Sequence, residues 1–190
     1  MLILARHGQT AANASGLLLG RNDVDLNEVG RGQATAVGRA LAGATRVISS
    51  PLLRARRTAE AIGLPVEIDD RWIEVDYGIY DGEPLADVPR EVWEHWRHDP
   101  EWCPPEGESM ASVGRRVREA CDGLVEAASA SDVVVVSHVS PIKAAVTWAL
   151  GVGDEATWRM FLDVASISRI GVSGRGPSLR SYNDCHHLEG

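Results

Sequence analysis

Two histidines and two arginines of this chain follow short apolar runs that are typical of buried β-strands. Arg6 and His7 come directly after the first run. Arg54 lies a few residues past the second, and His138 follows a run of four valines and a serine. An imidazole can attack phosphorus as a nucleophile, and guanidinium groups bind the oxygens of a phosphoryl group. These residue types therefore predict phosphoryl-transfer chemistry, which needs little beyond positioning and charge stabilisation.

The elements that must position these residues can be read from the hydrophobic pattern. Strands are expected over residues 2–5, 46–49, 65–68 and 133–136, with weaker ones over 167–172 and 178–182. Helices are expected after Asn27, from about Leu52, over 91–98, after Ser109, and from Pro141 to Leu150, where Gly151 ends the last one. This alternation predicts an α/β fold: a three-layer sandwich whose mostly parallel central sheet has helices on both faces.

The expected sheet brings the four reactive residues to one place. In open α/β sheets the ligand crevice lies beyond the carboxyl ends of the strands, so Arg6, His7, Arg54 and His138 should meet at one edge. Clustered cations repel one another unless an anion lies between them. Gly8 has no side chain and would let the backbone approach a bound phosphate. The cluster therefore favours an anion pocket.

Composition excludes several other classes of function. Apolar residues make up 44% of the 190 residues, enough for one domain with a sizeable core. The net charge of −8 leaves no basic face for nucleic acid, and the longest apolar run is far too short to span a membrane. The three cysteines are odd in number and widely spaced, which favours neither disulfides nor zinc, so a reduced, cytoplasmic location is expected.

Five segments together resemble the histidine phosphatase superfamily, the phosphoglycerate mutase-like proteins. In chain order the matching segments are Arg6–Thr10 with Asn13, Ser49–Ala55, Glu74–Gly78 with Asp81–Gly82, Pro105–Ser109, and Val136–His138. Each motif alone is weak, but five in order on an α/β pattern are specific. The resemblance implies a single histidine phosphatase domain over residues 1–190, with a small helical cap segment over about 83–105.

The resemblance also implies roles for individual residues. His7 would become phosphohistidine, and Glu74 would protonate the leaving oxygen and then activate water, with Asp76 as the alternative acid. The phosphoryl group would be bound by Arg6, Arg54 and His138, with Arg57 the alternative to Arg54. The further substrate-binding residues would be Asn13, Thr10, Gly20, Arg21 and the backbone amide of Val139, with a surface position the alternative for Arg21.

Two departures from the family pattern stand out. Val139-Ser140-Pro141 follows His138 where the family commonly has two glycines or Gly-Asn, and this run resembles a subgroup related to α-ribazole phosphatase domains, including those fused to ribonuclease H. Glu106 replaces the usual first glycine of the Pro-Gly-Gly-Glu-Ser loop.

The implied function is a metal-independent, cofactor-free phosphatase acting on a small phosphorylated metabolite. The alternatives are a cofactor-dependent phosphoglycerate mutase, a phosphoprotein phosphatase, and a catalytically inactive binding protein, which should have lost one of the reactive residues. A homodimer is left open. So is the choice between pocket-lining and core positions for the tryptophans Trp93, Trp96 and Trp102. The Cys185–His187 run is expected to be a frayed tail rather than a metal site.

Overall fold

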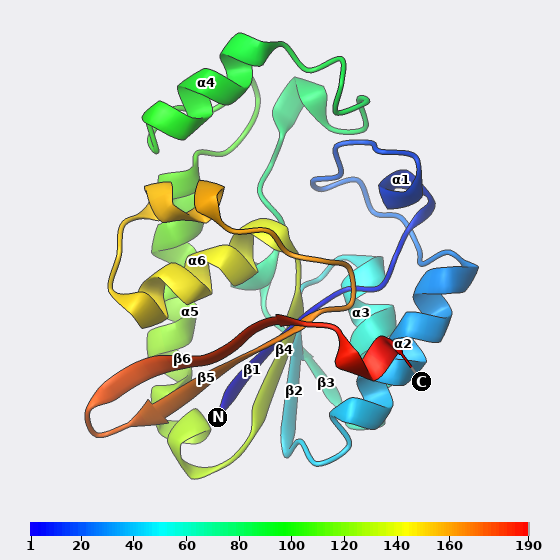
Figure 1. Cartoon of the computed structure of the whole chain (residues 1–190), viewed down its shortest axis with the longest axis vertical. Coiled ribbons are helices and arrows are strands. Elements are labelled where there is room, and N and C mark those ends of the chain that lie inside the picture. The colour runs from blue at the N-terminus through cyan, green and yellow to red at the C-terminus, as the bar shows by residue number, and fades with distance from the viewer. Residues whose placement is uncertain (190) are drawn as a thin grey trace.

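A six-stranded sheet forms the centre of the protein in the computed structural model, which describes residues 1–189 (Figure 1). The strands are β1 (Leu2–Arg6), β2 (Arg46–Ser49), β3 (Val66–Ile68), β4 (Val133–Ser137), β5 (Ile167–Ser173) and β6 (Gly176–Asp184). Their spatial order is β3-β2-β4-β1-β5-β6. The pairs β3–β2, β2–β4 and β4–β1 are parallel, and β5 and β6 extend the sheet antiparallel. The predicted α/β fold with a mostly parallel sheet is confirmed.

The register of the parallel strands brings their carboxyl ends level. Arg6 at the end of β1 lies opposite Ser137 at the end of β4, and Ser49 at the end of β2 lies opposite Val136. The residues that follow these strands therefore emerge side by side at one edge of the sheet. Helices α1 and α4 lie beyond that edge (Figure 1).

The described residues, 1–189, form six α-helices around the sheet and beyond its carboxyl edge. They are α1 (Ala11–Ala14), α2 (Glu28–Ala40), α3 (Leu53–Glu60), α4 (Arg90–His98), α5 (Met110–Ala130) and α6 (Val139–Leu150). Asn27 caps α2 by accepting a bond from the Gly30 amide, and Ser109 caps α5 through the Ser112 amide, both as expected. Gly151 ends α6 in the left-handed conformation.

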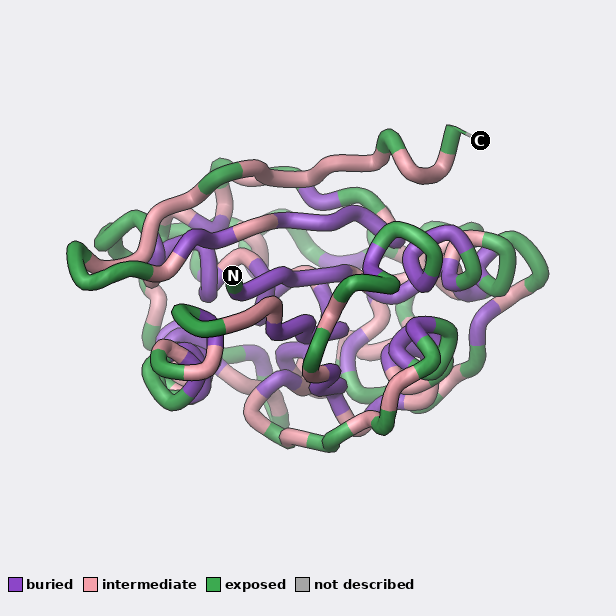
Figure 2. The backbone as a smooth tube through the Cα atoms, turned by 90° about the horizontal axis from the view of Figure 1, so that it is seen from below, coloured by how far each residue is buried: buried purple, intermediate pink, exposed green. Residues whose placement is uncertain are grey.

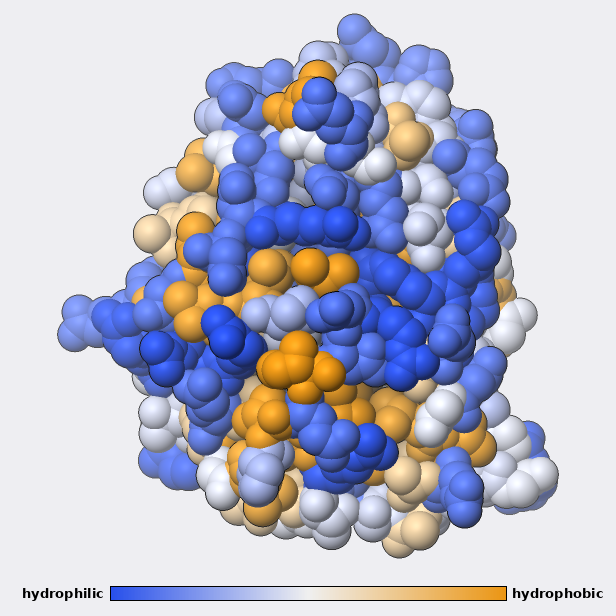
Figure 3. All heavy atoms as spheres, turned by 180° about the vertical axis from the view of Figure 1, so that it is seen from behind, coloured by the Kyte–Doolittle hydropathy of each residue, from blue (hydrophilic) through white to orange (hydrophobic). Residues whose placement is uncertain are grey.

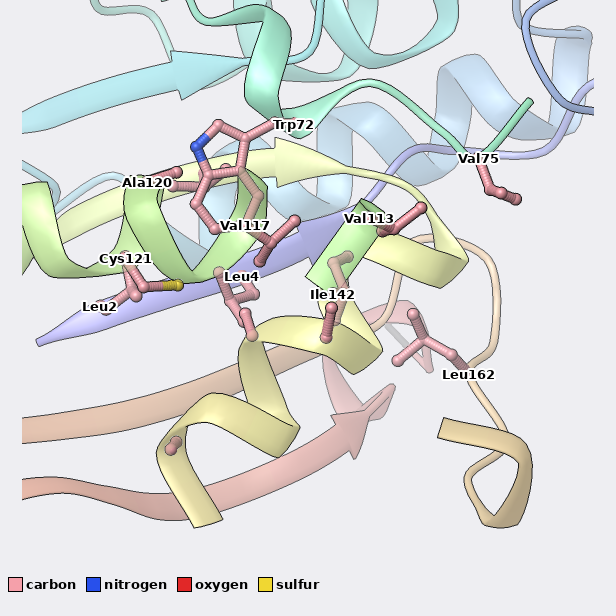
Figure 4. Packing of buried hydrophobic residues seen from close by; sticks show 14 of the residues in the cluster. Leu2, Leu4, Trp72, Val75, Val113, Val117, Ala120, Cys121, Ile142 and Leu162 are labelled. Atoms are coloured by element: carbon pink, nitrogen blue, oxygen red, sulfur yellow. The ribbon is translucent and has the colours of Figure 1, made fainter. Parts of the chain in front are cut away.

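The two faces of β1 are covered by different helices. Leu2 and Leu4 belong to a core with residues of α5 and α6, whereas Ile3 and Ala5 belong to a second core with residues of α2 and α3. Successive side chains of a strand point to opposite faces, so a short apolar run buried throughout requires cover on both sides. Figure 2 shows the buried strands between layers of partly exposed helix. Figure 4 shows the first core, where Trp72 and Leu4 lie near Val117 of α5.

Two sequence-based expectations were wrong. Helix α6 begins at Val139 rather than Pro141, because proline is tolerated in a first turn, where its missing N–H has no intrahelical partner. The tail is not frayed: Leu188 packs against the second core, and the ring of His187 lies 3.0 Å from the carbonyl oxygen of Ala165.

The surface opposite the view of Figure 1 is mostly polar, with separate apolar patches (Figure 3). None of the helices described within residues 1–189 has both the length and the apolar character of a membrane span.

Candidate active site

A cleft of about 740 Å³ opens at the carboxyl edge of the sheet. Five of the predicted site residues line it: Arg6, His7, Asn13, Glu74 and Val139. Two others, Arg54 and His138, are fully buried and lie against His7 from the inside of the protein. The residues that follow β1 and β4 therefore line the cleft, and Arg54 of α3 lies buried behind His7.

The side chain of His7 has a defined tautomer. Its Nδ1 lies 2.7 Å from the carbonyl oxygen of Gly8, which can only accept, so Nδ1 carries the proton. The lone pair is therefore on Nε2, which accepts a long 3.3 Å bond from Nε of Arg54. Burial, followed by the charges of Arg54 and Arg6, holds the pKa of His7 well below its usual range. His7 is a neutral imidazole whose Nε2 can attack.

His138 is the second imidazole of the site, 5.0 Å from His7 between ring centroids. Its Nε2 lies 2.7 Å from the hydroxyl oxygen of Ser50, and that oxygen also accepts a bond from the Leu52 amide. The Ser50 hydroxyl has no other acceptor among residues 1–189, so it donates to Nε2, which leaves the proton of His138 on Nδ1. That nitrogen is buried and has no partner among the described residues, so it is a donor available to a bound oxygen.

Arg54 is held rigidly by backbone oxygens. Its two terminal nitrogens donate to the carbonyls of Gly20 (2.6 Å) and Asn22 (2.9 Å), and burial lowers its pKa to about 10. The alternative residue, Arg57, lies at the surface and pairs with Glu60. Geometry therefore places Arg54 rather than Arg57 beside His7, because the phase of α3 directs it inward.

Arg6 reaches the cleft from the end of β1. One terminal nitrogen donates to the carbonyl oxygen of Leu162 at 2.6 Å, while its buried Nε has no partner among residues 1–189. Burial lowers the pKa of Arg6, and the charge of Glu74 opposes that effect. A buried guanidinium with an unused donor is suited to an anion.

Glu74 is fixed against the start of α6. One carboxylate oxygen accepts from the amides of Val75 (2.8 Å) and Ser140 (3.1 Å), and the other accepts from the amide of Val139 (3.0 Å). The Val139 amide therefore serves Glu74, whereas the sequence placed it at the phosphate. Glu74 as a whole is 3% exposed and lines the cleft.

Three predicted substrate-binding residues do not line the cleft. Thr10 is fully buried and caps α1 by exchanging hydrogen bonds with Asn13. Gly20 acts through its carbonyl, which holds Arg54. Arg21 is drawn to the surface by Asp76 and Glu108, at 3.4 and 3.2 Å. These residues shape the site without facing a ligand in the cleft.

The tryptophans form an aromatic cluster beside the cleft rather than its wall. Trp96 of α4 is buried against Tyr77 and Trp102, and Trp93 stacks on it. Trp93 and Trp96 line an adjoining cavity of about 60 Å³, which shares Tyr77, Val139 and Lys143 with the cleft. The cap segment contributes Leu85 and Arg97 to the cleft instead.

Sequence reasoning missed three features of the site. Ser50, inside a quoted motif, orients His138. Asp81, also inside a quoted motif, accepts bonds from the amides of Gly20, Arg21 and Asn22. Glu106, in place of a glycine, adopts a left-handed φ of 61°, which explains why glycine suits that loop. Within residues 1–189, no three His, Cys, Asp or Glu side chains lie close enough together to hold a metal ion.

A family model and several curated sequences match this chain. A family model described as histidine phosphatase superfamily (branch 1) matches residues 2–185. A bifunctional protein of Mycobacterium tuberculosis is 40% identical over 88% of this chain and 49% of its own length, so the chain spans about half the length of that curated relative. A probable phosphoglycerate mutase of Yersinia enterocolitica is 33% identical over 99% of this chain and 94% of its own.

Several solved structures are also similar to this chain. A phosphoserine phosphatase from Entamoeba histolytica, in complex with phosphoserine, has a TM-score of 0.89 at 26% identity and covers 98% of both chains. A mycobacterial glucosyl-3-phosphoglycerate phosphatase has a TM-score of 0.88 at 28% identity, covering 97% of this chain and 99% of its own. An Escherichia coli protein described as a putative alpha-ribazole-5'-P phosphatase has a TM-score of 0.83 at 28% identity, covering 96% and 95%.

Proposed function

Because the chain belongs to branch 1 of the histidine phosphatase superfamily, we propose that it hydrolyses a small phosphomonoester through a phosphohistidine at His7, without a metal ion. The observation that carries the proposal is the tautomer of His7, whose Nε2 lone pair borders the cleft. Several of the similar solved structures are phosphatases, and two hold phosphoserine or 3-phosphoglycerate.

In the first step, Nε2 of His7 attacks phosphorus and the bond from phosphorus to the leaving oxygen breaks. Glu74, in its protonated form, gives its proton to that oxygen. The bound phosphoryl group replaces the long Arg54–His7 contact and takes donors from Arg6, Arg54 and Nδ1 of His138. The dianion offsets the two guanidinium charges, which otherwise repel each other.

In the second step, a water molecule attacks the phosphorus of phosphohistidine. The Glu74 carboxylate takes the proton of that water, the P–N bond breaks, and its electron pair returns to Nε2 of His7. Inorganic phosphate leaves and the enzyme is regenerated. A mutase would have to exclude this water. The exposed Phe161 (74%) and Leu85 (47%) at the cleft favour access of water and therefore hydrolysis.

The test compares His7→Ala with the wild type on p-nitrophenyl phosphate, with and without a chelator. We expect the wild type to release nitrophenol equally with the chelator and to form an acid-labile, alkali-stable phosphoenzyme after rapid quenching. His7→Ala should lose both signals, by roughly a thousandfold or more in kcat. His186→Ala, whose side chain is 92% exposed, is the matched control and should keep both. Activity that survives in His7→Ala, or that the chelator abolishes, would overturn the mechanism.

A mutase remains the second candidate because a probable phosphoglycerate mutase covers nearly the whole chain. Incubation of the phosphoenzyme with 2-phosphoglycerate or 3-phosphoglycerate distinguishes the two functions. A hydrolase releases inorganic phosphate and glycerate, whereas a mutase interconverts the two esters. Interconversion faster than phosphate release would replace the proposed hydrolysis.

A further inference from the structure

Lys143 is the only lysine in the chain, and its side chain lines the candidate active-site cleft. The other cationic side chains are arginines. Lys143 lies on α6, one helical turn after Val139, and residues four apart lie on the same face of a helix. Both side chains border the cleft. A lone lysine at this position carries its charge into the space that a substrate would fill.

The ammonium group of Lys143 has no partner in the part of the chain that the structure describes. Among residues 1–189, no carboxylate lies within 4.0 Å of it and no hydrogen bond to it is formed, although the residue is half-buried. Partial burial lowers the pKa of Lys143, an effect opposed by the charge of Glu74 and increased by that of Arg6. A partly desolvated charge without a partner costs free energy, which an anion bound next to it would recover.

The nearby carboxylates do not supply that anion. Glu74 already accepts bonds from three backbone amides, two of them from the first turn of α6. Asp163 also lines the cleft but accepts a bond from the side-chain amide of Asn183 at 2.8 Å. Arg97, at the cap side of the cleft, is exposed and adds a further positive charge.

When a phosphoryl group occupies the site, the positive charge of Lys143 is the one left without a matching negative charge. In the proposed first step a phosphoryl dianion offsets Arg6 and Arg54, while Glu74 must be protonated to serve as the acid. Lys143 then carries a positive charge on the Glu74 side of the cleft, which is the side of the leaving oxygen. A single carboxylate on the leaving group would match this charge and the donors of one ammonium.

We infer that Lys143 is a specificity-determining residue that binds a carboxylate on the leaving-group part of the substrate. The substrate class is therefore a carboxylated phosphomonoester, and the inference rests on the proposed phosphatase function. An ammonium–carboxylate hydrogen bond of this kind contributes about tenfold or more in binding affinity.

Two matched substrate pairs test this inference. 3-Phosphoglycerate and glycerol 3-phosphate differ by a carboxylate against a hydroxymethyl group, and phosphoserine and phosphoethanolamine differ by the carboxylate alone. We expect the wild type to favour the carboxylated member of each pair in kcat/KM. Lys143→Met should reduce that preference about tenfold or more, mainly through KM, and Lys143→Arg should retain most of it. Arg90→Met, on the exposed side of α4, is the control and should leave the preference unchanged.

The outcomes distinguish a failure of this inference from a failure of the proposed phosphatase function on which it rests. If the wild type hydrolyses neither these esters nor an aryl phosphate, the proposed function fails. If it hydrolyses them but shows no carboxylate preference, or if Lys143→Met lowers both members of a pair equally, the role of Lys143 is overturned. Equal loss is what a purely structural contribution of the lysine stem would produce.

The single lysine also permits a direct binding measurement. In the His7→Ala variant, which should not turn over, acetylation of Lys143 by acetic anhydride can be followed by mass spectrometry. We expect 3-phosphoglycerate to slow acetylation at Lys143, and glycerol 3-phosphate to slow it much less. The amino group of Met1 bonds to Ser131 and Asp132 at the amino ends of β1 and β4, opposite the cleft, and is an internal control. Equal protection by both esters would contradict the inference.

Discussion

At the scale of single residues, Glu74 illustrates how the backbone can position a group that we propose as the catalytic acid. Its two oxygens accept bonds from the amides of Val75, Val139 and Ser140, which fixes the plane of the carboxyl group. Two of those amides belong to the first turn of α6, whose N–H groups have no intrahelical partners. The carbonyl of His138, which immediately precedes α6, accepts from the Ile142 amide of the same helix, while Ser50 orients its ring. Acid and imidazole are therefore positioned together.

Glu74→Gln should lower activity far more for esters with basic leaving groups than for esters whose leaving groups are weakly basic. An amide cannot donate the proton that an alkoxide needs, whereas an activated aryl oxide leaves without it. We expect kcat/KM to fall by about 10²–10⁴ for an alkyl phosphate and much less for dinitrophenyl phosphate. Glu83→Gln, on the exposed part of the cap segment, serves as the control. Equal losses for both esters would move the acid role away from Glu74, with Asp76 the first alternative.

At the scale of elements, the segment 20–22 acts as a clamp on α3. Its carbonyls hold the guanidinium of Arg54, and its three amides donate to Asp81 at 2.8–2.9 Å. Asp81 thus reaches the site only through this backbone, and it is a positioning residue. A rigid acceptor pair keeps Arg54 aimed at the ligand before any ligand binds.

Asp81→Ala should weaken phosphoryl binding without removing any group that touches the substrate. With its three amide bonds lost, the segment 20–22 loosens and Arg54 samples other orientations. We expect kcat/KM for aryl phosphate to fall by roughly tenfold or more, and affinity for vanadate to fall in parallel. Asp87→Ala, an exposed acid in the same connecting segment, should change neither. A drop in thermal stability with unchanged vanadate affinity would show that Asp81 serves only the fold.

Element limits were predictable where a single side chain determines them. Asn27, Ser109 and Gly151 mark helix ends because their caps satisfy backbone groups locally. The antiparallel direction of β5 and β6 was not predictable, because it depends on which edge of the sheet is free once the parallel strands have paired. Helix α1 was not predicted, because its four residues are too few to show the hydrophobic period of a helix.

At the scale of the whole molecule, convergence of the site was predictable because parallel strands end at the same edge. That argument placed His7 and His138 together before any contact was known. It does not reach Arg21, which the resemblance placed at the substrate with a surface position as the alternative, and whose direction is set by Glu108, a residue 87 positions later. Side chains whose partners come from distant loops cannot be oriented from local pattern alone.

The two buried histidines also tie the site to the stability of the whole fold. The pKa values of His7 and His138 lie well below 6.5, first because of burial and then because of the charge of Arg54. In the unfolded chain both titrate near 6.5. Below that pH the unfolded state binds protons that the folded state does not, so folding stability must fall as the pH falls. Above about pH 7.5 the two states are equally deprotonated and this contribution vanishes.

The free energy of unfolding should therefore decrease below pH 6.5 by up to about 1.4 kcal/mol per pH unit for each histidine. Urea unfolding at pH 7.5 and 5.5 measures it. The double variant His7→Asn, His138→Gln keeps a donor for the Gly8 carbonyl and an acceptor for Ser50 but cannot titrate, so its slope should be shallower. His186→Gln, in the exposed tail, should keep the wild-type slope. An unchanged slope in the double variant would mean that the folded histidines bind protons as the unfolded ones do. His7 would then lack, in acid, the Nε2 lone pair with which it attacks phosphorus.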